Sequence, residues 1–162
     1  MIEWDMLKNA LSAALAKLYQ QDGYLINHAF SQDCETNHAC ERAAVFRFGH
    51  YFAALIEEQM PGYVVDSEYS LALEEKRKIL PSWPNGCYPD IILHRRGQTE
   101  NVLALEVKGW WGKHLEYEIN RDIRKILELE NHMNYQYGAV ILLEKEFPRI
   151  FWIDGKENPH GN

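Results

Sequence analysis

Two carboxylic acids and a lysine, Asp90, Glu106 and Lys108, are the residues whose types and spacing are best suited to chemistry. Asp90 lies in an apolar run over residues 88–94, and Glu106 and Lys108 end a second apolar run over residues 102–108. A short polar segment containing a glycine separates the two runs, which predicts an antiparallel hairpin. Asp90 then lies opposite Glu106, because the two are equidistant from the hairpin centre, and alternation places Glu106 and Lys108 on one face.

Two carboxylates on directly opposed strand residues, about 5 Å apart at Cβ, repel each other, and a divalent cation removes the conflict. Mg²⁺ takes oxygen ligands, often one or two carboxylates together with waters and substrate phosphates. A lysine beside such an ion orients an attacking water or stabilises negative charge on a phosphate. Asp90, Glu106 and Lys108 therefore predict a Mg²⁺ site, at which Mn²⁺ is the expected substitute. The alternative is a cross-strand salt bridge on a solvated face.

The rest of the chain supplies elements that would hold this hairpin in a sheet. Apolar residues at helical spacing predict helices over residues 2–21, 38–59 and 114–133. Strands are predicted at residues 63–73, in both arms of the hairpin 88–108, at 137–143 and at 147–154, with loops at 24–37 and 74–87. The expected fold class is α/β, with a central mixed sheet and helices on its faces.

A third carboxylate, Glu41, lies on the backward extension of the apolar stripe of the second predicted helix. The stripe passes through Val45, Phe48 and Phe52 at steps of three and four, and one further step of four reaches Glu41. A carboxylate on a core-facing stripe is costly unless it is paired or liganded. A glutamate near a helix N-terminus is, however, also favourable through the helix dipole. From the stripe alone, Glu41 is therefore either a paired or liganded carboxylate of the site or a glutamate stabilised near the start of its helix.

Pro89-Asp90, followed after a hairpin by Glu106-Val107-Lys108, resembles the motif of the PD-(D/E)XK nuclease superfamily. The core of that superfamily has the order αβββαβ, and residues 38–143 are predicted to supply these elements in that order. The resemblance implies a restriction-endonuclease-like core within a single domain, 1–162. An extra N-terminal helix and loop occupy residues 1–37, and an extra strand and tail occupy residues 144–162.

The resemblance also implies a function, metal-dependent hydrolysis of DNA phosphodiester bonds by a deoxyribonuclease. Nucleases of the superfamily often carry an acidic residue on the helix before the first core strand, facing the metal. The implied metal ligands are Asp90, Glu106, the Val107 carbonyl and Glu41. Lys108 is the implied catalytic amine.

Basic and aromatic side chains near the motif are candidates for contact with DNA. The candidates are Lys76, Arg77, Lys78, Trp110, Arg121, Arg124 and Lys125. The triplet 76–78 either contacts phosphates or forms an exposed charged turn. Trp110 either stacks on bases or caps the hydrophobic core. The three basic residues of 114–133 are implied by the resemblance, because superfamily members commonly turn this helix toward the substrate.

Composition limits the class of protein. An apolar fraction of 46% with 12% aromatic residues is typical of a globular domain rather than a disordered chain. The net charge of −7 argues against strong metal-free DNA binding, although a site that binds phosphate through metal needs less bulk positive charge. No run of eighteen apolar residues is present, so neither a membrane span nor membrane association is expected.

Three cysteines cannot complete a disulfide framework, so a reduced, cytoplasmic setting is expected. Cys34, His38 and Cys40 have the residue types of a zinc site, but their spacing matches no tight Cys-x₂-Cys pair. Buried or idle thiols are the default interpretation of these cysteines.

Two further functions compete with the nuclease. A nuclease-like module that binds a protein or nucleic-acid partner without cutting, for example in a phage-defence or mobile-element complex, would fit the small size and acidic charge. The complete set of Asp90, Glu106 and Lys108 argues against such a module. A small-molecule metallohydrolase would need more histidines near the carboxylates. For the nuclease the expected partners are DNA and either a second copy of the chain or a larger complex, because double-strand cutting needs two sites.

Overall fold

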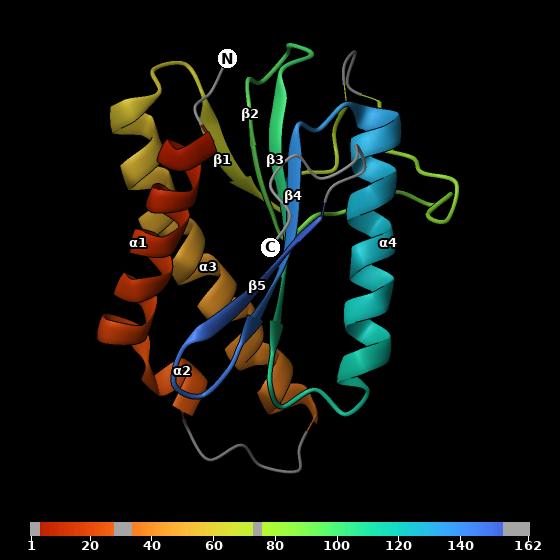
Figure 1. Ribbon diagram of the computed structural model, residues 1–162. Coiled ribbons are helices and arrows are strands. Elements are labelled where there is room, and N and C mark those ends of the chain that lie inside the picture. Colours follow the sequence, from red (N-terminus) through yellow and green to blue (C-terminus); the bar gives the residue numbers. More distant parts are fainter. Residues whose placement is uncertain (1–3, 28–33, 73–75, 154–162) are drawn as a thin grey trace.

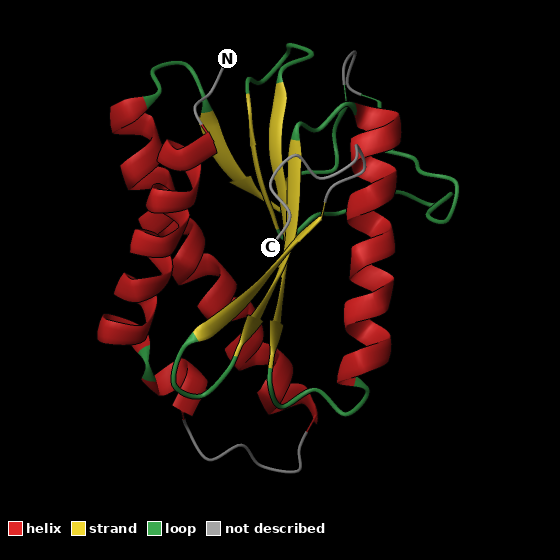
Figure 2. Ribbon diagram, in the orientation of Figure 1, coloured by secondary structure: helices red, strands yellow, loops and turns green. Residues whose placement is uncertain are grey.

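The computed structural model describes residues 4–27, 34–72 and 76–153, and for residues 34–39 it describes the helical backbone alone. The helices are α1 (Trp4–Asp22), α2 (Tyr24–Asn27), α3 (Cys34–Gln59) and α4 (Leu115–Met133). The strands are β1 (Val64–Ser67), β2 (Ile91–His94), β3 (Asn101–Gly109), β4 (Tyr137–Leu143) and β5 (Pro148–Ile153). The strands form a layer between α1 and α3 on one side and α4 on the other (Figures 1 and 2).

The five strands form one open sheet in the order β1-β2-β3-β4-β5. Neighbouring strands are antiparallel except β3 and β4, which are parallel and are connected by α4. A parallel pair needs such a crossover connection, and a helix that packs back on the sheet supplies it. The predicted α/β class with a central mixed sheet flanked by helices is confirmed. The predicted burial of the run 137–143 is confirmed for residues 138–143, whereas Tyr137 is half-buried, and the edge position of β5 is confirmed.

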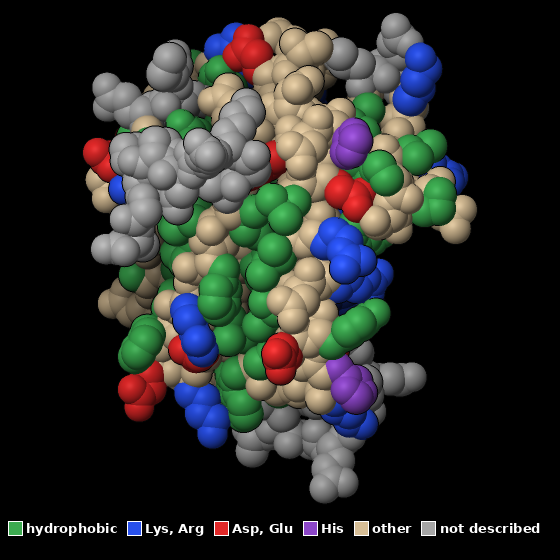
Figure 3. All heavy atoms as spheres, turned by 45° about the vertical axis from the view of Figure 1, so that its right-hand side comes forward, with side chains coloured by type: hydrophobic (Ala, Val, Ile, Leu, Met, Phe, Trp, Pro, Cys, Tyr) green, Lys and Arg blue, Asp and Glu red, His purple; other side chains and the backbone are tan. Residues whose placement is uncertain are grey.

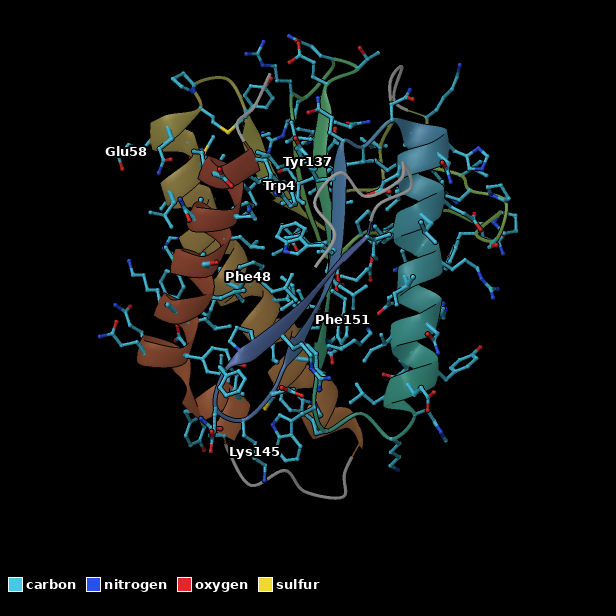
Figure 4. All side chains as sticks on the ribbon, viewed as in Figure 1. Trp4, Phe48, Glu58, Tyr137, Lys145 and Phe151 are labelled. Carbon is cyan, nitrogen blue, oxygen red and sulfur yellow. The ribbon has the colours of Figure 1, made fainter. Side chains whose placement is uncertain are left out.

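Each face of the sheet has its own apolar layer. Leu103, Leu105 and Val107 of β3 pack in the cluster formed with α1 and α3, whereas Ala104 packs in the cluster with α4. Phe48 lies between α3 and the sheet (Figure 4). Because side chains alternate along a strand, Ala104, Glu106 and Lys108 face α4.

Helix α1 packs on α3, as its Ala- and Leu-rich sequence predicts. Its buried residues are Leu7, Ala10, Leu11, Ala14, Leu15 and Leu18. At its beginning the Trp4 ring lies 4.6 Å from the rings of both Tyr137 and Trp152, measured between centroids (Figure 4). The predicted helix over 2–21 is therefore confirmed from residue 4, with residues 2 and 3 outside the described part of the chain, and its aromatic start joins α1 to β4 and β5. Among the described residues, no helix combines the length and the apolar character that crossing a bilayer requires.

The predicted strand over 63–73 is wrong beyond Ser67. Glu68 has φ +50°, a left-handed conformation that an extended strand does not contain. Val65 and Tyr69 would lie on one face of a continuous strand. With the left-handed turn at Glu68 between them, Val65 packs on the α3 side and Tyr69 on the α4 side. Residues 76–87 are irregular, as predicted, apart from isolated bridges between Leu71 and Arg77 and between Leu80 and Trp83.

The predicted loop over 24–37 is also partly wrong. Residues 24–27 form α2, whose Ile26 is fully buried, and α3 begins at Cys34 rather than at residue 38. The Gly23 carbonyl accepts the amides of Ile26 and Asn27, which closes the turn of α2. Ile26 and Leu25 join this segment to the core that it shares with α3.

The packing of α3 predicts that two of its phenylalanines contribute differently to stability. Phe48 is fully buried, whereas the side chain of Phe46 is 67% exposed. Phe48→Ala is expected to lower the free energy of unfolding by about 3–5 kcal/mol, because it leaves a cavity between α3 and the sheet. Phe46→Ala is the matched control and is expected to change it by less than about 0.5 kcal/mol. Urea denaturation measures both, and equal effects would contradict this packing.

Candidate active site

Asp90 and Glu106 meet where β2 begins and β3 ends. Ile91 pairs with Leu105, so one further step of the same register places Asp90 opposite Glu106, as predicted from the sequence. Ile92 and Ala104, two residues away from each, both pack on the α4 side. The carboxylates of Asp90 and Glu106 therefore lie on the same face of the sheet.

Asp90 is held in place through both its side chain and its backbone. Its Oδ2 accepts a 2.7 Å hydrogen bond from the amide of Val107. Its backbone carbonyl accepts hydrogen bonds from the Ser67 hydroxyl at 2.8 Å and from the Glu68 amide at 3.3 Å. The N–H and C=O groups of one strand residue point to the same side, so the Val107 carbonyl is also turned toward Asp90.

Glu106 is buried against α4, with 1% of its surface exposed. The Lys125 ammonium lies 2.8 Å from its Oε2. The other oxygen, Oε1, is buried and has no hydrogen-bond partner within the described parts of the chain. One oxygen of Glu106 is therefore paired with a fixed lysine, and the other is left for a ligand outside the chain.

Lys108 lies between carboxylates from two helices. Its Nζ is 3.4 Å from Asp122 Oδ2 of α4 and 3.8 Å from Glu41 Oε1 of α3. The second oxygen of Glu41 accepts a 2.9 Å hydrogen bond from the Gly109 amide. Glu41 thus reaches the site from the start of α3, as its place on the apolar stripe predicts. Its contacts hold Lys108 and the end of β3, and its role as a metal ligand stays a prediction.

The cluster carries more negative than positive charge. Four carboxylates, Glu41, Asp90, Glu106 and Asp122, face two ammonium groups, those of Lys108 and Lys125, which leaves a formal charge of −2 when all are ionised. A net charge of this size is costly away from water unless a cation compensates for it. One divalent cation would compensate for it fully.

The pKa values of the cluster show the same imbalance. Burial raises the pKa of Asp90 to about 6, although the Val107 hydrogen bond and both lysines oppose the shift. Burial and the nearby Asp90 raise the pKa of Glu106 well above its usual value, against the effect of Lys125. Burial alone would lower the pKa of Lys108, but Asp122 and Glu41 outweigh it and raise that pKa. The surrounding carboxylates therefore favour the charged form of Lys108.

The oxygen atoms that face one another suit a hard cation that takes only a few of its ligands from the protein. No group of three or more His, Cys, Asp or Glu side chains among the described residues has the geometry of a metal centre. Mg²⁺ needs fewer, because it commonly keeps several waters and binds one or two carboxylates. Asp90, the unpaired Oε1 of Glu106 and the Val107 carbonyl supply such a set.

Two of the seven candidates for DNA contact lie on the exposed side of α4 near this cluster. Arg121 and Arg124 line an open hollow of about 320 Å³ together with Trp83 and Tyr117. Figure 3 brings the α4 side forward and shows a small group of basic side chains at the right of a surface of mixed charge. Substrate contact through a small patch is compatible with the acidic net charge of the whole chain.

The three basic residues 76–78 differ in exposure, since two lie at the surface and one is buried. Lys76 and Arg77 are exposed, and Arg77 donates a 3.5 Å hydrogen bond to the Asn85 carbonyl. Lys78 is 2% exposed and donates to the Tyr69 carbonyl at 2.8 Å. Its ammonium is therefore turned into the protein, because Tyr69 packs on the α4 side, and it does not form part of a surface for a phosphate backbone.

Trp110 and Lys125, two of the candidates for contact with DNA, each have a partner within the protein. The Trp110 ring packs against the α3-side core, and its Nε1 donates a 3.0 Å hydrogen bond to the Ile26 carbonyl. The Lys145 ammonium covers this ring at 4.4 Å from its centroid. These contacts favour the core-capping alternative over base stacking. Lys125 points to Glu106 and belongs to the charge cluster rather than to the exposed face of α4.

Asp122 is the member of the cluster that the sequence analysis missed. It lies three residues after Ile119 and four before Ile126, on the stripe of α4 that packs against the sheet. The argument that selected Glu41 on α3 applies equally to Asp122. An acidic residue on the apolar stripe of a helix next to the Glu-x-Lys strand was therefore a usable signal.

The possible zinc ligands fall mostly outside the described side chains. The side chains of Cys34 and His38 are not described, and Cys40 is a half-buried free thiol. Cys87 is a buried free thiol of the α4-side core. Burial raises the pKa of the Cys87 thiol to about 11, so this residue is inert at neutral pH.

Comparison with known proteins adds no family to this geometry. No protein-family model matches the chain, and no curated protein matches it at a significant level of similarity.

The raised pKa of Asp90 predicts a pH-dependent stabilisation by Asp90→Asn. Between the unfolded pKa of about 3.9 and the folded value of about 6, the unfolded chain loses its proton first, so stability falls as pH rises through this window. The ionised carboxylate costs the folded state about 3 kcal/mol at pH 8 by this linkage. Because Asn keeps a weaker bond to Val107, we expect Asp90→Asn to gain about 1–2 kcal/mol at pH 8 and little at pH 4.5.

Urea denaturation in EDTA at the two pH values measures this gain. Glu57→Gln, at an exposed position near the end of α3, is the control and is expected to show no such difference. A destabilised Asp90→Asn protein at pH 8 would contradict the electrostatic account of the cluster.

Proposed function

We propose that the chain is a metal-dependent nuclease that hydrolyses DNA phosphodiester bonds, with a restriction-endonuclease-like αβββαβ core from α3 to β4. The observation that supports this most directly is the cluster of four carboxylates and two lysines at the end of β3, whose formal charge is −2 when all are ionised. The order of elements and the parallel β3–β4 pair are compatible with such a core. The order of elements is independent of the short Pro-Asp and Glu-x-Lys motif, and Glu41, Asp122 and Lys125 extend the cluster beyond that motif.

Each residue of the cluster has a proposed role that follows from its contacts. Asp90, Glu106 Oε1 and the Val107 carbonyl would hold Mg²⁺ or Mn²⁺, which would supply a bound water of lowered pKa and polarise the phosphate. Lys125 orients Glu106 by pairing with its other oxygen. Lys108 keeps its positive charge and stabilises negative charge on the phosphate, while Glu41 and Asp122 fix its position. Arg121 and Arg124 would contact the phosphate backbone beside the cluster.

The nuclease proposal predicts the loss of cleavage in Lys108→Ala. Plasmid, linear duplex and single-stranded DNA are each incubated with Mg²⁺ or Mn²⁺ and, separately, with EDTA. The wild type should cut only with metal, and Lys108→Ala should be at least about 100-fold slower, since it removes a charge that acts at the reacting phosphate. Lys113→Ala, in the exposed loop before α4, is the matched control and should cut at the wild-type rate. Equal cleavage by wild type and Lys108→Ala would contradict the proposal.

A non-cutting module that binds a partner is the second candidate function, again as part of a larger complex. The Lys125 ammonium at 2.8 Å from Glu106 favours it, because a fixed lysine already supplies positive charge where a cation would bind. The low bulk positive charge is compatible with a protein partner.

Calorimetric titration with Mn²⁺ separates the two functions. The nuclease predicts that about one Mn²⁺ binds per chain and that Glu106→Gln weakens binding by at least about tenfold, because a ligand oxygen loses its charge. Glu128→Gln, on the same side of the protein but bonded to Ser82, is the control and should bind as the wild type does. A folded wild-type protein that binds no Mn²⁺ would leave only the non-cutting module.

A further inference from the structure

A second pocket lies at the opposite end of the strands from the charge cluster. Its volume is about 200 Å³, and the ends of β2 and α4 and the start of β3 form its walls. Asn101 at this end of β3 is seven residues from Lys108, which corresponds to roughly 23 Å along the strand. In Figure 1 this is the upper part of the molecule, between the β2–β3 hairpin and the C-terminal end of α4. The pocket is therefore separate from the proposed nuclease site.

The pocket contains a buried ammonium, that of Lys78, which has no carboxylate partner among the side chains that the structure describes. Lys78 is 2% exposed, and its Nζ donates one hydrogen bond, to the Tyr69 carbonyl, and lies 4.5 Å from the centroid of the Tyr69 ring. None of the carboxylates in the described ranges forms a salt bridge with it. A buried charge without a counter-ion is costly, and burial lowers the pKa of Lys78 to about 8.

Asp66, the carboxylate whose charge acts on Lys78, already has two other partners. Asp66 influences Lys78 through its charge, but its Oδ2 lies 2.8 Å from His94 Nε2. The Arg96 guanidinium binds both oxygens of the same carboxylate. Because Arg96 and His94 hold Asp66 in this arrangement, the Lys78 ammonium keeps donor capacity that no described acidic side chain uses.

The lining of the pocket favours a negatively charged ligand. Its described lining includes the basic residues Lys78 and His132 and no aspartate or glutamate. His94 also lines it, but this ring is bound to Asp66, and burial lowers its pKa. This composition contrasts with a chain whose net charge is −7. The remaining polar lining consists of neutral hydrogen-bonding groups, those of Tyr69, Gln98, Thr99, Asn101 and Asn134.

We propose that this pocket binds a small oxyanion, a phosphate or carboxylate group, whose charge pairs with the buried ammonium of Lys78. The anion would accept a charge-assisted hydrogen bond from Lys78 and so supply a counter-ion that no acidic side chain within residues 4–27, 40–72 and 76–153 provides. The tyrosine ring and Leu71 and Met133 form the apolar part of the wall, so the anionic group enters a partly dry site. This site is independent of the proposed nuclease function.

A titration followed by ¹H–¹⁵N chemical shifts tests the site on the full chain in EDTA, without DNA. Sodium phosphate and sodium acetate are added separately, with sodium chloride at matched ionic strength as the reference. We expect saturable shifts of the Gln98, Thr99 and Asn101 amides with at least one of the two anions. Phosphate alone identifies a phosphate site, acetate alone a carboxylate site, and both together a general oxyanion site.

Three variants locate the anion. Lys78→Met keeps a similar volume in the buried position and should weaken binding at least tenfold. Ala72→Phe leaves Lys78 intact but fills the pocket, so it should weaken binding equally, and it decides the question if Lys78→Met fails to fold. Lys113→Met, an exposed lysine far from the pocket, should bind as the wild type does. The absence of saturable shifts in the wild type, or unchanged binding by a folded Lys78→Met protein, would overturn the proposal. If Lys78→Met does not fold, unchanged binding by Ala72→Phe would overturn it.

Discussion

The uncompensated negative charge buried at the end of β3 is the constraint on which the rest of the structure depends. Four carboxylates and two lysines meet there, although they come from α3, the start of β2, β3 and α4. Removing ionised groups from water is costly unless their partners are held in good geometry. The surrounding elements are accordingly rigid ones, two long helices and the central strands of the sheet.

The topology explains how such distant residues come together. β3 and β4 run parallel, and the crossover through α4 brings the beginning of that helix to the end of β3. The start of α3 reaches the same place from the other layer, where Glu41 accepts the Gly109 amide. The backbone of Asp90 is bound to β1 through Ser67 and Glu68. Residues from both helical layers and from the sheet thus meet at the end of β3, the central strand. A hard cation bound there would complete the charge balance.

Much of this arrangement could be predicted from the sequence because it depends on local periodicity. The hairpin register that opposes Asp90 and Glu106 follows from two apolar runs and a central turn, and Glu41 follows from a helical stripe. The end of β1 could not be predicted, because the alternating pattern continues past Glu68, where the backbone turns left-handed. Lys78 could not be placed either, since its neighbours Lys76 and Arg77 are exposed, and only the packing of Tyr69 on the α4 side draws it inward.

The most direct test of the account is a crystal structure with Mn²⁺, whose anomalous scattering locates the ion without reference to activity. The account predicts a single strong peak with the Asp90 carboxylate, the Oε1 of Glu106 and the Val107 carbonyl each at about 2.0–2.3 Å. A cluster of the same geometry with no Mn²⁺ between Asp90 and Glu106, at a concentration that saturates other hard-cation sites, would contradict it.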